Sequence, residues 1–282
     1  MTIQSTNDRM PLLTRRNIVA GAMAAGLSAR LSAHLPAEAA KLKMQRLAWA
    51  GMHLKLGNAS LFIDAMANPN VWEKSLGDKL VPIEPSAETY ALITHRHPDH
   101  FDLATVTSAL GTSGTLVYPA GIAPPAGVQF RLRPAAMFEP QILGDFTATA
   151  VPAADGYGDP QVSWIVSAAG RRIIHCGDTL WHGYWWHIGR QYGPFDAAFL
   201  PINGAKFSWR QPASDIPAVL TPEQAVAAAV ILGARQLVPI HFGVQHAEGY
   251  AEVDDPLRQL RIAAERRGIR VNAMQPGEWQ DL

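Results

Sequence analysis

Cysteine is almost absent from this sequence, because its 282 residues contain a single one, Cys176. A lone thiol excludes an intramolecular disulfide framework and a cysteine-rich zinc site. Any bound metal must therefore be held by histidine and carboxylate side chains. Free cysteine is most often a small buried hydrophobic residue, and we interpret Cys176 in this way, beside a site and not as part of it.

Net charge and long apolar runs are also missing. The chain has 24 Lys and Arg against 24 Asp and Glu, so no net field attracts nucleic acid or an anionic membrane. The apolar run near the N-terminus, Ile18 to Ala29, falls short of the about 20 residues that a membrane span needs. With 48% hydrophobic and 17% charged residues, the composition is that of a globular protein with a large core. We expect a small-molecule substrate, no nucleic acid and no membrane span in the mature chain. The oligomeric state is left open.

The first 39 residues are typical of an export signal. Arg15 and Arg16 precede the weakly apolar run, which is followed by Ala37-Glu38-Ala39, an A-x-A cleavage pattern. This layout predicts a twin-arginine signal and an exported, periplasmic protein. A polar tail with a chance arginine pair is the alternative. With cleavage after Ala39, residues 40–282 form a single domain.

The mature chain begins with strands and then alternates strands with helices. Expected strands cover Leu47–Ala50, His53–Leu56, Ala59–Asp64, Thr89–Ile93, Thr115–Tyr118, Phe146–Val151, Val162–Ser167, Arg171–His175, Ala197–Leu200, Leu237–Ile240 and Ile269–Ala273. Expected helices cover Asp102–Leu110, Pro222–Leu232 and Asp255–Arg267. The middle helix has a capping box formed by Thr221 and Gln224, and Gly233 ends it. This order predicts an α/β protein in which helices cover sheets.

Three polar clusters stand directly after apolar, strand-like runs. They are the segment 95–100, the loop Gly177-Asp178-Thr179, and His241. Since α/β proteins place their sites in loops at the carboxyl ends of strands, we expect the three clusters to share one site.

The first cluster, His95-Arg96-His97-Pro98-Asp99-His100, has four potential metal ligands in six residues. Residues 95 and 97 can point one way and residues 99 and 100 another, which suits two adjacent metals. Imidazole and carboxylate are the ligands of hydrolytic zinc, iron and manganese centres. A solvated polar turn is the alternative for this motif taken alone.

This cluster resembles the HxHxDH signature of the metallo-β-lactamase superfamily. Other markers follow in the family's order: Trp49-Ala50-Gly51, Leu61-Phe62-Ile63-Asp64, Gly177-Asp178-Thr179 and Pro239-Ile240-His241-Phe242. Within the superfamily, the chain is most similar to the branch with ascorbate-phosphate lactonase and phospholipase D-like enzymes. The resemblance implies a four-layer αββα sandwich with two metals, and zinc is the first expectation. It implies His95 and His97 at one metal, Asp99, His100 and His241 at the other, and Asp178 shared by both.

One histidine that the family usually supplies is missing. It is expected after the strand that ends near Val151, where this chain has Asp155-Gly156-Tyr157 instead. We take Asp155 as the substitute ligand, which would make the first site harder and move its preference toward manganese or iron. The alternative is that Asp155 is only a turn residue, as Asp-Gly pairs often are. The first metal would then bind weakly or be lost.

Several other polar or aromatic residues are candidates for the surroundings of the site. Asp64 can orient a ligand imidazole, whereas His53, His182 and the aromatic Trp185 are candidates for contacts with the ligands or for the lining of the pocket. The alternative for each is an ordinary place in the core. Lys206 can reach an anionic substrate, although exposed lysines are usually solvated.

The expected chemistry is hydrolysis of an ester-like bond, in a lactone or a phosphodiester, by a metal-bound hydroxide that Asp99 orients. The sequence has no G-x-S-x-G elbow for a serine nucleophile. Iron-dependent redox chemistry on the same fold is one alternative, and a catalytically inactive binding protein is the other.

Overall fold

A computed structural model describes residues 40–282 except 73–74 and 245–246. The predicted export signal, residues 1–39, lies outside this part of the chain. Across the described residues, no helix has both the length and the apolar character that crossing a membrane demands.

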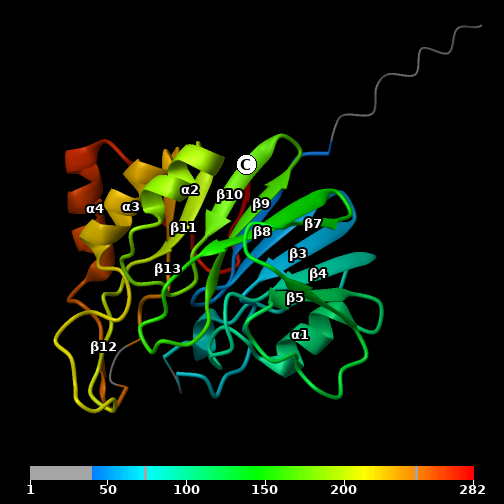
Figure 1. Cartoon of the computed structure of the whole chain (residues 1–282), viewed down its shortest axis with the longest axis horizontal. Coiled ribbons are helices and arrows are strands. Elements are labelled where there is room, and N and C mark those ends of the chain that lie inside the picture. Colours follow the sequence, from blue (N-terminus) through cyan, green and yellow to red (C-terminus); the bar gives the residue numbers. More distant parts are fainter. Residues whose placement is uncertain (1–39, 73–74, 245–246) are drawn as a thin grey trace, which may run out of the picture. The chain divides into compact units, whose positions relative to one another are not determined.

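Two seven-stranded sheets form the centre of the described fold (Figure 1). The first has the order β16-β1-β2-β3-β4-β5-β6, and the second has the order β15-β13-β11-β10-β9-β8-β7. The strands of the first sheet are β1 Lys43–Arg46, β2 Met52–Leu56, β3 Ala59–Ile63, β4 Glu88–Leu92, β5 Thr115–Pro119, β6 Arg131–Ala135 and β16 Trp279–Asp281. Those of the second are β7 Pro140–Leu143, β8 Phe146–Pro152, β9 Val162–Ala168, β10 Arg171–His175, β11 Ala197–Pro201, β13 Gln236–Ile240 and β15 Arg270–Val271. A separate two-stranded sheet pairs β12 Lys206–Phe207 with β14 Tyr250–Ala251.

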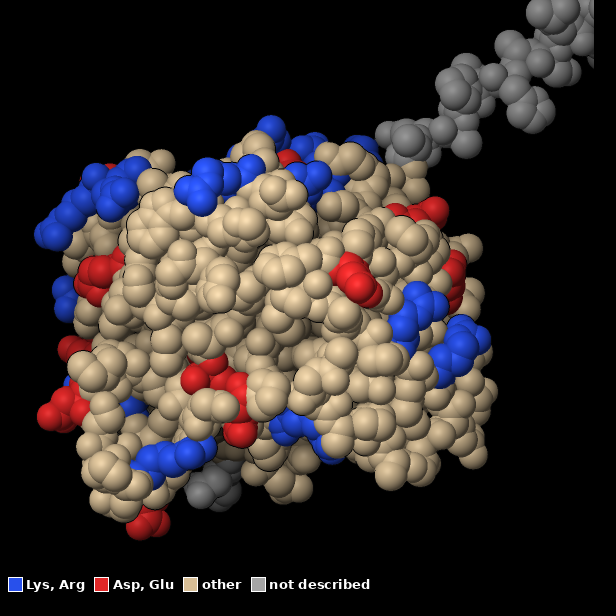
Figure 2. All heavy atoms as spheres, viewed as in Figure 1, with Lys and Arg blue, Asp and Glu red and all other residues tan. Residues whose placement is uncertain are grey.

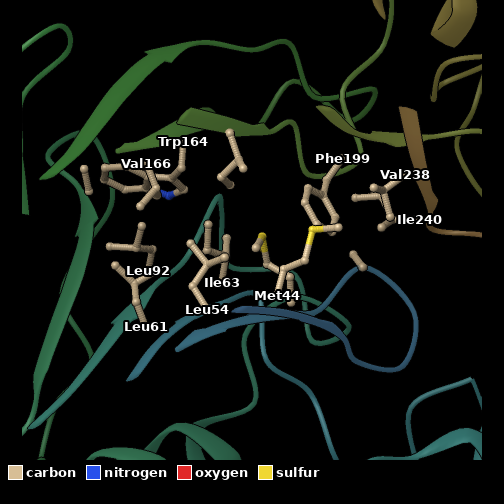
Figure 3. Close-up of a cluster of buried hydrophobic side chains, with 14 of the residues drawn as sticks. Met44, Leu54, Leu61, Ile63, Leu92, Trp164, Val166, Phe199, Val238 and Ile240 are labelled. Atoms are coloured by element: carbon tan, nitrogen blue, oxygen red, sulfur yellow. The ribbon is translucent and has the colours of Figure 1, made fainter. Parts of the chain in front are cut away.

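The two large sheets pack face to face through apolar side chains. Figure 3 shows Leu54, Leu61 and Leu92 of the first sheet opposite Trp164 and Val166 of the second. All five are at least nine-tenths buried. Because alternate residues of a strand point to opposite faces, the other faces of these sheets need covers of their own.

Helices supply these covers. One helix, α1 Leu103–Leu110, packs on the first sheet, where Val106 and Leu110 meet the buried Phe62. The second sheet is covered by α2 Trp185–Tyr192, α3 Pro222–Leu232 and α4 Pro256–Arg267, which share its outer core with Ile174 and Leu237. A short 3₁₀ helix, Gly77–Lys79, lies between β3 and β4 in the sequence. The described chain is thus a four-layer αββα sandwich, as the sequence predicted.

The helix ends follow from the local sequence. In α3, the Thr221 side chain accepts from the Gln224 amide, and the Gln224 side chain reaches back to the Thr221 amide. Gly233 then ends the helix in the left-handed conformation, at φ 65°. The Asp102 carboxylate caps the N-terminus of α1 by accepting from the Thr105 amide, directly after the histidine cluster.

The strand predicted at Leu47–Ala50 is wrong. The strand lies at Lys43–Arg46, and the predicted residues form a turn in which the Gly51 amide donates to the Ala48 carbonyl at 3.0 Å. Trp49 has a left-handed φ of 56°, which a β-strand cannot contain. This turn brings the Trp49 side chain to the polar clusters described below.

Charged side chains are sparse on the face shown in Figure 2. Lys and Arg lie along the upper edge and also at the right and lower parts of this view, and Asp and Glu form small separate groups, so this face carries charges of both signs.

Candidate metal centre

The three polar clusters converge at the carboxyl ends of strands from both large sheets. The histidine cluster follows β4, Asp178 follows β10, and His241 follows β13. Strands β10, β11 and β13 run parallel, so their carboxyl ends reach one edge of the second sheet. The His241 amide donates to the Trp49 carbonyl at 3.1 Å, which links that edge to the first sheet.

The backbone around these clusters is unusual. Trp49, Asp64, Trp72 and His241 all have left-handed φ angles, between 47° and 57°, although none is glycine. Such conformations cost about 1–3 kcal/mol each and tend to gather at functional sites. Gly177 has a φ of 59°, a conformation that favours glycine. A Cβ at this position would also stand 2.8 Å from the Thr94 hydroxyl.

The Asp178 carboxylate is the centre of the cluster. Its Oδ2 atom lies 3.6 Å from His95 Nε2, 4.0 Å from His97 Nδ1, 3.8 Å from His100 Nε2 and 3.9 Å from His241 Nε2. Asp178 is 8% exposed, so four imidazoles surround one nearly buried carboxylate oxygen.

A second carboxylate, that of Asp99, stands on the other side of two of these rings. Its Oδ2 atom lies 3.8 Å from both His100 Nε2 and His241 Nε2. The same oxygen accepts hydrogen bonds from the indoles of Trp49, at 3.0 Å, and Trp72, at 3.1 Å. Two fixed donors therefore hold the Asp99 carboxylate in place.

Asp64 orients His100 from behind. Its fully buried carboxylate accepts from the Thr94 amide at 2.7 Å and from the Thr94 hydroxyl at 2.6 Å. It lies 2.9 Å from His100 Nδ1, so Nδ1–H donates to it and Nε2 faces the cluster. This arrangement is the one usual for metal-ligating histidines.

His241 is oriented by neighbours to which the sequence assigned no such role. Its ring packs against Trp49 in a tilted arrangement with centroids 4.1 Å apart, and its Nδ1 lies 3.1 Å from the Asn203 side-chain amide. Asn203 also contacts the Tyr250 hydroxyl at 2.6 Å, and Tyr250 donates to Glu252 at 3.1 Å. Asn203 follows β11 as His241 follows β13, and this position after a strand is the signal that could have identified Asn203. The local sequence of Tyr250 and Glu252 contains no such signal.

The cluster contains buried polar atoms without a hydrogen-bond partner. They are His100 Nε2, His241 Nε2, Asp178 Oδ1 and Asp155 Oδ2. A buried polar atom left unpaired costs about 1–3 kcal/mol, so four at one place call for a ligand. Imidazole nitrogens and carboxylate oxygens are together the donor set that divalent transition metals take. The residues present therefore fit a metal centre.

The potential ligand atoms form three groups, two of which share His97. Within each group the atoms lie within 4.8 Å of one another: His95, His97 and Asp178; Asp99, His100 and His241; and His97, Asp155 and Asp159. The structure thus brings together all seven residues predicted as ligands, and it adds Asp159, which sequence reasoning missed.

Asp155 combines both interpretations open at the sequence level. Its Oδ1 atom accepts from the Tyr157 amide at 2.5 Å, which is a turn contact. Its unpaired Oδ2 atom lies 3.7 Å from His97 Nε2 and is free to bind a metal. Asp159 reaches the same nitrogen at 3.0 Å from an exposed position.

Burial and neighbouring charges set the protonation of the cluster. Burial lowers the pKa of His95 and of His241 well below the usual value, so both imidazoles are neutral. Burial also acts to lower the pKa of His100, but Asp99, Asp178 and Asp64 outweigh it and raise that pKa to about 10. Burial and then the charge of Asp178 raise the pKa of Asp155 to about 6.

Four residues predicted around the site lie elsewhere. His53 is 2.9 Å from the Ser60 hydroxyl in a separate hollow, because residue 53 points to the helix side of the first sheet. His182 stacks on Trp185 with centroids 4.1 Å apart, and Trp185 is fully buried in the helix-covered core. Lys206 is exposed, because strand alternation turns it away from the side of Phe207.

A pocket of about 420 Å³ opens beside the cluster. It reaches Asp99, Asp178, His97 and His241 on one side. Its other described lining residues are Asn70, Val71, Trp72, Pro98, Tyr157, Phe207, Trp209 and Tyr250. The aromatic side chains of the pocket are therefore Trp72, Tyr157, Phe207, Trp209 and Tyr250, whereas the candidate Trp185 has its alternative place in the core.

Comparison with known proteins gives a matching family and relatives, some of them named as metal-dependent hydrolases. Residues 61–242 match the family described as the beta-lactamase superfamily domain. An uncharacterized protein of Mycobacterium tuberculosis is 28% identical over 214 residues, which cover 67% of this chain and 53% of that protein. This chain thus spans about half the length of that relative. A protein of Methanoculleus marisnigri named as a metal-dependent hydrolase is 27% identical over 250 residues, covering 83% of this chain and 95% of its own.

Among solved structures, Igni18, a metallo hydrolase from the archaeon Ignicoccus hospitalis, is similar with a TM-score of 0.64 and 20% identity. The superposition covers 86% of this chain and 98% of that one. At this identity the likeness shows a shared fold.

Proposed function

Because this chain belongs to the metallo-β-lactamase superfamily, we propose that it is a metal-dependent hydrolase acting on an ester-like bond, in a lactone or a phosphodiester. The observation that carries the proposal is the set of unpaired, buried ligand atoms around Asp178. A fold that only needed stability would not leave these atoms without partners. The name of the Methanoculleus relative supports the same reaction class.

The side chains divide into two ligand sets. His95 and His97 would hold one divalent ion, Asp99, His100 and His241 a second, and Asp178 lies within 4 Å of four of these residues, so it can serve both. Ions held there would activate a water molecule and polarise the bond to be cleaved. The protein's own part is to fix this geometry before substrate arrives.

Asp99 has the position of the residue that orients the attacking water. Its carboxylate faces the pocket and is held by the Trp49 and Trp72 indoles. A carboxylate with this support can accept a proton from water without losing its orientation. Because burial lowers the pKa of His95 and of His241, both imidazoles are neutral and need no deprotonation before they bind metal.

Zinc is the first metal we propose, with manganese or iron as the other choices. Asp155, where the family usually has histidine, gives the His95 and His97 side a harder oxygen ligand, and such ligands suit manganese and iron better. Placement in the lactonase and phospholipase D-like branch is part of the same proposal.

We further propose that the protein is exported through a twin-arginine signal. The support is the sequence of residues 1–39, with Arg15 and Arg16 before an apolar run and an A-x-A site. Expression of the full chain and of an Arg15→Lys/Arg16→Lys variant tests this. We expect the native chain in the periplasmic fraction and the variant in the cytoplasmic one; equal distribution would refute the signal.

Metal analysis of the purified protein, combined with turnover of lactones, phosphodiesters and β-lactams, tests the function. We expect bound divalent metal and chelator-sensitive turnover of an ester-like substrate. His97→Ala should lower kcat/KM by at least about a hundredfold, the upper end of what outer-shell residues cost. His187→Ala is the control, since His187 is an exposed histidine on α2 that faces Phe138 and not the cluster.

Turnover that survives complete chelation would overturn the proposal, as would an unimpaired His97→Ala protein. Oxygen-dependent turnover by an iron-loaded protein would do the same, since hydrolysis needs no oxygen.

A further inference from the structure

The pocket beside the metal centre has an aromatic wall made by segments that are far apart in the sequence. Trp72, Tyr157, Phe207, Trp209 and Tyr250 all line it. Their rings form one continuous set, with centroids 4.6 Å apart for Trp72 and Tyr250, 4.8 Å for Tyr157 and Phe207, and 4.9 Å for Phe207 and Trp209. This wall faces the cluster through the contact of Tyr157 with His97, at 5.3 Å.

The small β12–β14 sheet holds the centre of this wall. Phe207 and Tyr250 are direct cross-strand partners, so their side chains leave the sheet on the same face, with centroids 5.7 Å apart. Trp209 packs against Gly249, where a Cβ would stand 2.7 Å from the indole. In Figure 1, β12 lies apart from the two large sheets, below β11 and β13, where the parallel strands end. Tyr250 and Phe207 also pack at the margin of the main core, and both line the pocket.

The wall is also joined to the metal centre. The Trp72 indole donates to Asp99, and the Tyr250 hydroxyl contacts Asn203, which orients His241. Two of the five rings are therefore fixed by the groups that hold the ligands. A substrate resting on these rings has a defined distance to the reacting atoms.

No lysine or arginine is among the described residues that line this pocket. Within the described part of the chain, Lys206 of β12 and Arg210 of the loop after it are the cations beside Phe207 and Trp209. Lys206 lies one residue from Phe207 and so points to the other face of β12, and Arg210 sits over the Tyr157 ring at 4.1 Å. The charged groups in the lining are Asp99 and Asp178 of the cluster itself. Among the described lining residues, an anionic group held away from the metals would therefore meet carboxylates and no cation.

We propose that the pocket selects substrates whose non-reacting part is uncharged and apolar, with an aryl or alkyl group resting on the aromatic wall. This inference rests on the proposed function and narrows its substrate class: it favours neutral esters or lactones over substrates with a second anionic group. The volume of about 420 Å³ falls within the usual range of small-molecule sites.

A quaternary ammonium group is the other ligand that aromatic rings attract. Cation binding needs open ring faces around one point, whereas here the rings lie against one another at 4.6 to 5.7 Å. The geometry therefore favours a flat or extended apolar group along the wall.

A series of 4-nitrophenyl esters tests the inference, because the bond cleaved and the leaving group stay the same while the acyl group changes. We expect the metal-loaded protein to prefer the phenylacetate and hexanoate over the hemisuccinate and the trimethylammonio-butyrate by at least about tenfold in kcat/KM. Equal values, or a preference for either charged ester, would overturn the inference and leave the proposed function standing. No turnover of any of these esters would also overturn the inference, and the proposed function would then be decided by the lactone and phosphodiester assays.

Binding supplies a readout that does not depend on turnover. Saturation-transfer NMR with phenylacetamide should show contact of its ring with both zinc-loaded and chelator-treated protein, whereas succinamate should show none with the latter. Absence of transfer to phenylacetamide in both forms would overturn the inference whatever the ester assay gives.

Two matched tryptophan variants locate the effect. Trp209 and Trp186 are 47% and 48% exposed, but only Trp209 lines the pocket, since Trp186 lies on α2. We expect Trp209→Ala to raise KM for the phenylacetate about tenfold and to weaken saturation transfer. Trp186→Ala should behave as the native protein. Equal effects of the two substitutions would overturn the role of the wall.

Discussion

Replacement of Asp155 by asparagine should have opposite effects on the metal-free and the metal-loaded protein. Asparagine has the same shape and can keep Oδ1 as the acceptor for the Tyr157 amide, so the turn is preserved. It removes the negative charge from the buried Oδ2 position, 3.7 Å from His97. The substitution thus separates the turn role of Asp155 from its role as a ligand.

The magnitude follows from the pKa of Asp155. Burial, and then the charge of Asp178, raise this pKa to about 6 from the ordinary 3.8, so the folded protein favours the neutral carboxyl. Such a shift is worth at most about 3 kcal/mol, and we expect about 1–2 kcal/mol because solvent screens part of the interaction. The stabilising contribution is complete below pH 3.8 and is lost as pH rises through 6.

The metal-free Asp155→Asn protein should therefore melt above the native protein at pH 8, by about 3–6 °C for a domain of this size. Near pH 4 the two should melt at the same temperature, because the native carboxyl is then neutral as well. In the metal-loaded state the order reverses, since the variant lacks a charged ligand. We expect its metal affinity to fall at least about tenfold.

Thermal unfolding of chelator-treated protein at both pH values measures the first effect, and competition with a fluorescent chelator measures the second. Asp159→Asn is the matched control. The hydrogen bond with His97 lowers the pKa of Asp159, so its charge stabilises the fold at neutral pH and its removal should not raise the melting temperature. A metal-free Asp155→Asn protein that melts no higher than native at pH 8 would refute the charge argument. Unchanged metal affinity would show that Asp155 is a turn residue only.

Three further predictions concern residues that hold the centre. Asp64→Asn removes the carboxylate oxygen that accepts from His100 Nδ1–H and from the Thr94 hydroxyl. Chelator competition should show a metal affinity about 10–100-fold lower, and denaturant unfolding should show a free energy of unfolding about 3–5 kcal/mol lower. Native values in both assays would contradict this role of Asp64. Gly177→Ala places a Cβ 2.8 Å from the Thr94 hydroxyl at a left-handed φ, so unfolding should show a loss of about 2 kcal/mol or more. Gly170→Ala, with φ 73° but open space, should lose less, and equal losses would rule out the close contact. Because neighbouring carboxylates raise the pKa of His100 to about 10, zinc binding at pH 7 should release a proton from His100. Calorimetry in buffers of different ionisation enthalpy measures the number of protons released. No release would contradict the raised pKa.

The sequence by itself determined the fold class and the order of the potential ligands. The alternation of strands and helices predicted an α/β protein, and the comparison and the two packed sheets confirm a metallo-β-lactamase sandwich. The capping box at Thr221 and the glycine at 233 fixed the ends of one helix, because these signals depend on neighbours a few residues away. The cluster from His95 to His100 was readable for the same reason, since its ligand types stand close together in the chain.

Tertiary structure alone decided the surroundings of that cluster. Trp72 and Tyr250 lie in the pocket because the loop after β3 and strand β14 meet there, and nothing in their local sequence indicates it. Trp185 looked equally suitable for a pocket wall, but packing of α2 buries it in the core. Tertiary structure also decided the side of the sheet to which His53 points, because this side depends on the register of β2 in its sheet.

Asp155 shows where the two levels of information meet. Its sequence, Asp-Gly after a strand, was compatible with a turn or with a ligand; in the structure one carboxylate oxygen accepts the turn hydrogen bond and the other is unpaired beside His97. Local sequence sets turns because they are short-range, whereas the charge and burial that shift its pKa come from Asp178 and from packing far along the chain. Seven of the eight potential ligands could therefore be named from the sequence, whereas Asp159, the electrostatics and the pocket could not.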